Sequence, residues 1–260
     1  MTAKRALLRT LELALPVGLV ALWWLASRNS KSLFFPPLES IWAVFYGTYI
    51  FDRFDQDVLP NLARLATGFA LAAVIGIAGG MVLGLSHGIR RLLLPLIEFF
   101  RAMPVVALLP AALILLGTGD VMEVSMIAFA AVWPILISTA NGVASVEPVM
   151  LDTARIYGLS RARTIREIAL PAALPQIFAG LRIALPLAIA LMVVANMFGT
   201  TNGIGYAVVM AQQTFNVRAS WSAIIMAGLI GSVLNVTLRQ IEWNILTWHR
   251  RWRARVESPA

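Results

Sequence analysis

The feature that most constrains this chain is a series of apolar runs of roughly 20 residues, the length that spans about 30 Å of hydrocarbon as a helix. Six such runs lie at 10–27, 62–86, 92–116, 121–143, 175–200 and 221–246. None shows the period-two alternation of a barrel strand, and lipid offers no partner to a free backbone amide. The sequence therefore predicts an all-α integral membrane protein with six transmembrane helices.

Composition excludes a soluble globule of this size. Of the 260 residues 59% are hydrophobic and 13% are charged, which leaves too little polar surface to cover a soluble domain. The absence of cysteine excludes disulfides and thiolate metal sites but does not settle the compartment. We interpret residues 1–260 as a single transmembrane domain.

Basic residues are distributed unequally between the two sides of the membrane. With the N-terminus inside, the inner segments carry Lys4, Arg5, Arg9, Arg90, Arg91, Arg155, Arg161, Arg163, Arg166, Arg239, Arg250, Arg251, Arg253 and Arg255, against Arg28, Lys31, Arg53 and Arg218 outside. This asymmetry predicts that both termini face the cytoplasm of a bacterial inner membrane. We interpret the net charge of +8 as this asymmetry and as contact with anionic lipid. Nucleic-acid binding is disfavoured because the basic residues are scattered over several loops.

The first run has a second possible interpretation, a cleaved secretory signal, because basic residues precede its apolar core. We favour an uncleaved helix, since Trp23 and Trp24 at its outer end fit an interfacial aromatic belt and no clear A-x-A site follows. The outer stretch from Arg28 to Pro60 is predicted to hold a short interfacial helix around Leu38 to Tyr46.

The second run carries a packing motif. Small residues recur every fourth position, at Gly68, Ala72, Gly76, Gly80 and Gly84, and so lie on nearly one helix face. Small residues at this spacing let helix backbones approach closely. Contact within the bundle is favoured over a subunit interface, although the same motif drives both.

The third run is predicted to kink or break, because Pro95, Pro104 and Pro110 each remove a backbone donor. Glu98 and Arg101 lie three residues apart and can pair across one helical turn. A functional and a structural role for this pair remain equally open, since both residues lie near the cytoplasmic end, where long side chains can snorkel.

Polar groups are otherwise few in the membrane. Asn196 and its neighbours in the fifth run either line a solute pathway or form an interhelical hydrogen bond. The candidates for a pathway are Arg101, Met103, Met192, Asn196 and Thr200. The glycine-rich stretch at 199–216 is predicted to form a turn or a short re-entrant element at the outer surface.

The segment at 145–182 is the only long, strongly basic interruption in the second half of the chain. Ser145 is predicted to cap a helix that Gly158 stops. Ser160 is predicted to cap a second helix, closed by Pro171. Periodicity alone also allows an amphipathic hairpin lying on the membrane surface.

The residues of this segment resemble the cytoplasmic loop of binding-protein-dependent ABC importer permeases. That loop reads Glu-Ala-Ala, three residues, Gly, nine or more residues, then an aliphatic residue with Leu-Pro. Here Asp152-Thr153-Ala154 is followed by Gly158 and by 168–171, with the spacing intact and two of the first three letters changed. The stretches at 34–42, 100–110 and 171–185 are similar to the nitrate, sulfonate and taurine branch, which often has an acidic residue where this chain has Asn196.

The resemblance implies a type I importer permease fold with a cytoplasmic coupling-helix loop, which we assign to the segment 145–171. The ATPase-coupling residues that it carries over are Asp152, Thr153, Ala154, Arg155, Tyr157, Gly158, Leu159, Ser160, Leu170 and Pro171. It implies a second permease copy, two ATP-binding subunits and an extracytoplasmic solute-binding protein. ATP and magnesium are expected on the ATPase subunits, with no cofactor on this chain, which lacks the G-x-x-x-x-G-K-[ST] phosphate loop.

Two other classes of protein would need features of their own in the sequence. A stand-alone secondary transporter or channel needs paired ionisable groups near the membrane midplane or inverted repeats. The sequence suggests neither, and the fourth and sixth runs are expected to carry almost no buried charge. A membrane enzyme needs clustered ligands or a nucleophile with its base, whereas the two histidines, His87 and His249, are far apart in sequence.

Overall fold

The computed structural model describes residues 2–248, with side chains from residue 14 onward. The long helices are α1 (Thr2–Ser27), α3 (Leu59–Leu85), α4 (His87–Ala102), α6 (Asp120–Ala144), α9 (Leu170–Gly199) and α11 (Val217–Ile245). The shorter ones are α2 (Leu38–Tyr46), α5 (Leu109–Leu116), α7 (Pro148–Ile156), α8 (Arg161–Thr164) and α10 (Ile204–Gln213). Four short helical segments have turns that are tighter or wider than those of an α-helix, namely η1 (Gly47–Asp52), η2 (Phe54–Val58), η3 (Val105–Leu108) and η4 (Ile165–Ala169). Residues 2–248 contain no strand, which confirms the all-helical prediction.

Four helices are long and apolar enough to cross a bilayer, namely Phe54–Leu85, Asp120–Ala144, Arg161–Gly199 and Val217–Ile245. They coincide with the second, fourth, fifth and sixth apolar runs. The third run supplies a fifth crossing if its two bent halves count as one. The first run lies in α1, whose described apolar part, Ala14–Ser27, is shorter than the others. Length and composition thus support four or five crossings among the described residues, against the six expected.

The third run breaks where prolines predicted a distortion. Helix α4 ends at Ala102, and the chain resumes at Val105 after a bend of 84°. Pro104 lies in the break, in an extended conformation. Pro110 lies in the first turn of α5, where a missing N–H leaves no helical bond unmade. Pro95 is accommodated inside α4.

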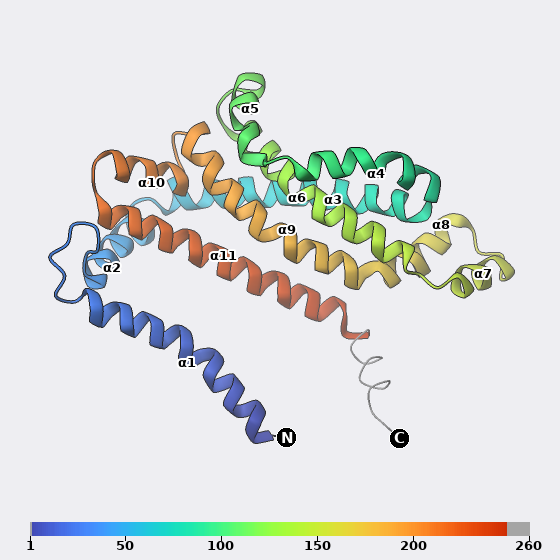
Figure 1. The fold of residues 1–260 in the computed structure, drawn as a ribbon, viewed down its shortest axis with the longest axis horizontal. Coiled ribbons are helices and arrows are strands. Elements are labelled where there is room, and N and C mark those ends of the chain that lie inside the picture. Colours follow the sequence, from blue (N-terminus) through green and yellow to red (C-terminus); the bar gives the residue numbers. More distant parts are fainter. Residues whose placement is uncertain (1, 249–260) are drawn as a thin grey trace.

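The long helices lie side by side, with α2 and α10 at one end and α7 and α8 at the other (Figure 1). We call these the α10 end and the α7 end. Helix α1 diverges from the bundle and is attached at the α10 end (Figure 1). There the ring centroids of Trp23 and Trp221 lie 5.3 Å apart, and Trp24 Nε1 donates a hydrogen bond to Glu39 at 3.0 Å. Helix α2 has the bounds that the sequence predicted.

The small-residue stripe of α3 packs against α6 of the same chain. A Cβ atom added at Gly80 would lie 2.5 Å from Thr139 Cβ and 2.6 Å from the Leu136 carbonyl oxygen. One at Gly84 would lie 2.5 Å from Val143 Cβ. Cβ atoms added at Gly68 and Gly76 would likewise lie too close to Ile127 and Ile135, so the contacts follow one another along α6. The glycines therefore serve helix packing within the bundle.

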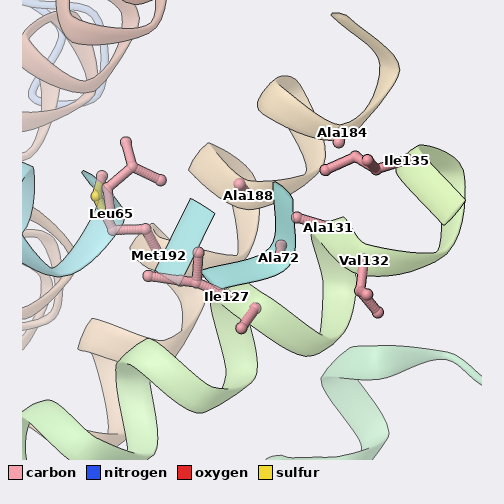
Figure 2. Packing of buried hydrophobic residues seen from close by; sticks show 10 residues of the cluster. Leu65, Ala72, Ile127, Ala131, Val132, Ile135, Ala184, Ala188 and Met192 are labelled. Carbon is pink, nitrogen blue, oxygen red and sulfur yellow. The ribbon is translucent and has the colours of Figure 1, made fainter. Parts of the chain in front are cut away.

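The apolar core lies between α3, α6 and α9. Figure 2 shows Ile127 and Ala131 of α6 close to Ala72 of α3 and Ala188 of α9. Small residues dominate the core because dispersion contacts between closely spaced backbones, and not exclusion of water, stabilise helix packing in lipid.

Two local predictions in the basic segment were wrong. Ser145 does not cap α7; it follows the last residue of α6, and its hydroxyl donates to the Gly142 carbonyl at 2.8 Å. Pro171 does not close the second helix, because α8, η4 and α9 continue as one helix from Arg161 to Gly199. The wide turn η4 precedes the proline, and Leu170 N donates to the Ile165 carbonyl five residues back. This wider turn accommodates a residue that has no N–H to donate.

Candidate functional site

The corner between α7 and α8 is formed by a glycine. Helix α7 ends at Ile156, and Gly158 has φ +65°, a conformation that a side chain would strain. Leu159 N donates to the Ala154 carbonyl at 2.9 Å, and Gly158 N donates to the Arg155 carbonyl at 3.0 Å. These bonds satisfy the last carbonyls of α7. Gly158 therefore ends the helix, as the sequence predicted.

The second helix begins as expected. The Ser160 hydroxyl accepts a hydrogen bond from Arg163 N at 3.4 Å, which is the geometry of an N-cap. Farther along, Leu170 packs on the cluster that contains Met81 and Val143. The corner is thus exposed, while the base of α9, which includes Pro171, is anchored to α3 and α6.

Large side chains project from the corner into solvent. Ile156 is 84% exposed and Tyr157 is 80% exposed, whereas Ala154 faces inward and is buried. Asp152 pairs with Arg155 at 3.1 Å on the exposed side, next to Thr153. An apolar surface framed by charged groups is typical of a contact site for another protein.

A second unusual region is a buried ion-pair network at the α10 end. Arg64 of α3 donates from Nε to Asp120 Oδ1 at 2.7 Å, and its Nη2 lies 2.7 Å from the same oxygen. Its Nη1 lies 3.2 Å from Glu123 Oε2. The Arg64 side chain is 9% exposed and that of Glu123 is 0% exposed, whereas that of Asp120 is 73% exposed. One guanidinium therefore bridges an exposed and a fully buried carboxylate.

Helix α9 joins this network through Asn196. Its side-chain Nδ2 donates a hydrogen bond to Glu123 Oε1, and Asn196 is itself fully buried. Its position is therefore that of an interhelical hydrogen bond. The carboxylate that faces Asn196 comes from Glu123 of the neighbouring helix α6.

Beside Asn196 lies a buried polar patch. Gly203, with φ +106°, donates from its backbone N to Asp57 Oδ1 at 2.8 Å. A Cβ atom at Gly203 would lie 2.3 Å from Asn196 Oδ1 and 2.6 Å from Asn61 Oδ1. Burial, followed by the nearby Asp57 carboxylate, raises the pKa of the Tyr49 phenol above its usual range. Tyr49 is therefore neutral at physiological pH. We call the buried residues Asp57, Asn61, Arg64, Glu123 and Asn196 the polar cluster.

The expectation of almost no buried charge in the fourth run was wrong, because Glu123 lies in the first turn of α6 and is paired with Arg64. Two acidic residues at the start of one apolar run and an arginine near the start of another are visible in the sequence. Both runs begin at the same end of the predicted bundle. That coincidence is the signal that could have indicated the pair.

The other pathway candidates are separated by the fold. Arg101 and Met103 line a cavity of about 350 Å³ at the break of the third run, together with Trp133 and Leu191. Arg101 also pairs with Glu98 at 3.7 Å, as predicted. Met192, in contrast, is buried in the apolar core.

Thr200 borders a second cavity, of about 280 Å³, which is also lined by Arg64. The five pathway candidates are therefore divided among two cavities, the core and the polar cluster.

Among the described residues no group of His, Cys, Asp and Glu could hold a metal ion. His87 is exposed at the start of α4. His249 and the basic residues Arg250, Arg251, Arg253 and Arg255 lie outside the described residues.

Fold and sites together define a multi-pass helical membrane protein with an exposed, partly apolar corner at one end and a buried ion-pair network at the other. Residues 75–242 match the family of the binding-protein-dependent transport system inner membrane component. The taurine transport system permease protein TauC of Escherichia coli K12 is 30% identical over 92% of this chain and 90% of its own length. The bicarbonate transport system permease protein CmpB of Synechococcus elongatus is 34% identical over 75% of this chain and 67% of its own.

The chain therefore belongs to the family of binding-protein-dependent ABC importer permeases, in its nitrate, sulfonate and taurine branch. The fold agrees. An inward-facing structure of the MetNI methionine ABC transporter matches with a TM-score of 0.62 at 18% identity, covering 73% of this chain and 94% of that one. A second crystal form gives 0.63 at 15% identity, covering 80% and 98%.

Proposed function

We propose that this chain forms the solute pathway of an ATP-driven importer of a small anion and that the α7–α8 corner couples it to a separate ATPase. The observation that carries the proposal is the exposure of Ile156 and Tyr157 on a corner that Gly158 forms at the α7 end. The basic residues at the start of α4 and in α7 and α8 lie at the same end (Figure 1), which supports assigning that end to the cytoplasm. Both termini then lie in the cytoplasm and α1 completes six crossings.

The coupling residues of the sequence prediction divide into two groups in space. Residues 152–160 form the exposed corner, whereas Leu170 and Pro171 belong to the anchored base of α9. A push on the corner would therefore be carried into the bundle through α9. ATP and magnesium would be held by the ATPase subunits.

The anionic nature of the solute is supported by two observations. The relatives described above transport taurine and bicarbonate, which both carry an anionic group. In this chain Arg101 presents a guanidinium to an otherwise mainly apolar cavity that also contains Met103. Two copies of the permease, two ATP-binding subunits and an extracytoplasmic solute-binding protein would complete the importer.

A glycine substitution tests the coupling role. Gly158→Leu places a side chain at φ +65° on the docking corner, so we expect uptake by the assembled importer to fall about tenfold or more while membrane insertion is retained. Gly88→Leu is the matched control, because Gly88 also has open space around it but no positive φ. Unchanged uptake by the Gly158 variant would contradict the coupling role.

The stand-alone transporter is the alternative, and the buried Arg64–Glu123 pair is the observation in its favour. Glu123 lies in the first turn of α6 and Arg64 near the start of α3, and not at the helix midpoints, where a solute site of that class is expected. Reconstitution decides between the two. Uptake by the purified chain in liposomes, driven by an ion gradient without any ATPase, would support the alternative.

A further inference from the structure

One helix connects the two unusual regions of the molecule. The segments α8, η4 and α9 run without interruption from Arg161 to Gly199, over 39 residues or about 58 Å. One end follows directly from the Gly158 corner. The other end carries Asn196, which bonds to the polar cluster. A displacement of the corner would therefore reach the polar cluster through a single continuous helix.

The Glu123 carboxylate is the point where three helices meet. Its Oε1 accepts a hydrogen bond from Asn196 of α9, and its Oε2 pairs with Arg64 of α3. A backbone bond lies beside it, in which Gly119 N donates to the Gly199 carbonyl at 2.8 Å. If α9 moves relative to α3, Glu123 must exchange one of its partners.

The closure at this end is tight and depends on a glycine. The two amide oxygens of Asn61 and Asn196 lie within 2.3–2.6 Å of the place where a Gly203 Cβ atom would stand. A side chain at Gly203 would displace the amide groups of Asn61 and Asn196 from their present positions and would strain the backbone at φ +106°.

The hydrogen bonds of the polar cluster are incomplete. Neither amide atom of Asn61 has a hydrogen-bonding partner within the described protein, and neither does Asn196 Oδ1, whereas Asp57 Oδ2 lies 3.6 Å from Arg53 Nη1 in an ion pair. Water that enters between separating helices would hydrate these polar groups, which lowers the cost of opening. The contacts of Glu123 must then hold the cluster closed.

We propose that the polar cluster is a latch at the α10 end, that helix Arg161–Gly199 operates it, and that Glu123 is the positioning residue that holds α3, α6 and α9 together. The link to ATP hydrolysis rests on the proposed function. The latch itself is a property of this chain alone.

A distance measurement on the purified permease in lipid nanodiscs tests the latch. The chain has no cysteine, so Ala63→Cys and Thr201→Cys introduce two spin-label sites without background. Both positions are exposed, one on α3 and one between α9 and α10. With Glu123→Gln we expect a longer-distance population at least about tenfold larger than in the labelled parent, because a charged partner of Arg64 is lost.

Asp120→Asn is the matched control. It removes the other carboxylate of Arg64, but Asp120 is exposed and solvent can replace it. The distance distribution should therefore stay close to that of the parent. If Asp120→Asn lengthens the distance as much as Glu123→Gln, the role of the buried carboxylate is refuted.

Asn196→Ala keeps the test decisive if Glu123→Gln does not insert, because it removes the bond from α9 without removing a charge. Parent-like distances in both variants would overturn the latch. No ATPase or solute is present in this measurement, so such a result would leave the import function standing. Conversely, normal uptake by the Gly158 variant would refute coupling and leave the latch intact.

Discussion

The two ends of helix Arg161–Gly199 are built in opposite ways. At the α7 end the charged groups, such as Asp152 and Arg155, lie in solvent, and the apolar side chains of Ile156 and Tyr157 are exposed. At the α10 end the Arg64 and Glu123 side chains are buried and pair with each other.

This difference separates residues that serve the fold from residues that serve a partner. An exposed ion pair contributes little because water competes for both charges. A buried pair is expensive to break because the remaining charge has no solvent. Substitutions at the α7 end should therefore change binding, and substitutions at the α10 end should change stability and conformation.

The largest effect is expected at Arg64. Arg64→Leu leaves Glu123 buried without its cation and should reduce the free energy of unfolding by about 3–5 kcal/mol. Thermal unfolding of the purified chain measures this. The matched control is Arg163→Leu, because Arg163 pairs with Glu167 at 3.3 Å in an exposed setting and should cost at most about 1 kcal/mol. Equal losses of stability in the two variants would contradict the difference between the buried and the exposed ion pair.

The next largest effect is expected where α3 packs against α6. Gly80→Ala forces a Cβ atom against Thr139 and should reduce the free energy of unfolding by about 1–3 kcal/mol. Gly228→Ala in α11 has open space around it and should be neutral or stabilising by up to about 1 kcal/mol. Denaturant titration of both variants measures the difference. A harmless Gly80→Ala would mean that α3 and α6 are not interlocked.

A smaller effect, on binding alone, is expected at the corner. Ile156→Ala should weaken binding of the ATPase subunit about tenfold, since exposed apolar side chains at a docking site become buried there. Stability should change by less than about 0.5 kcal/mol. Ile114→Ala is the control, because Ile114 and Ile156 are both 84% exposed. A binding titration in detergent compares them, and equal affinities would remove the corner from the coupling surface.

The smallest effect is expected for the exposed carboxylate of the corner. Asp152→Asn should change the free energy of unfolding by less than about 0.5 kcal/mol, and added salt should reduce even that. Thermal unfolding at two salt concentrations measures this change in stability. Glu123→Gln is measured for comparison, because it also replaces a carboxylate by an amide, but in a buried position. Exposed ion pairs contribute at most about 1 kcal/mol. A larger loss of stability that did not depend on salt would show that Asp152 is held more tightly than its exposure indicates.

Much of the fold could be predicted because local rules decide it. The lengths of the apolar runs, the bounds of α2, the break near Pro104 and the corner at Gly158 follow from residues that lie close together in the sequence. Pro171 shows where local rules stop. Whether Pro171 ends the helix depends on the wide turn η4 before it, and no residue preference predicts that turn.

The polar cluster could not be predicted in this way. Arg64 and Asp120 are 56 positions apart, and Asn196 and Glu123 are 73 apart. Whether Glu123 faces lipid, solvent or a guanidinium is decided by the rotation of α6 against α3. The glycine stripe of α3 indicates that a close contact exists, but it does not name the helix on the other side.

By itself the sequence determined that this is a helical membrane protein with a glycine corner after one helix, because hydrophobic length, proline and glycine act over a few residues. Only the tertiary structure decided that Glu123 is buried and paired, and that one unbroken helix joins the corner to the polar cluster. The physical reason is that the burial and pairing of a charge depend on neighbours from distant parts of the chain.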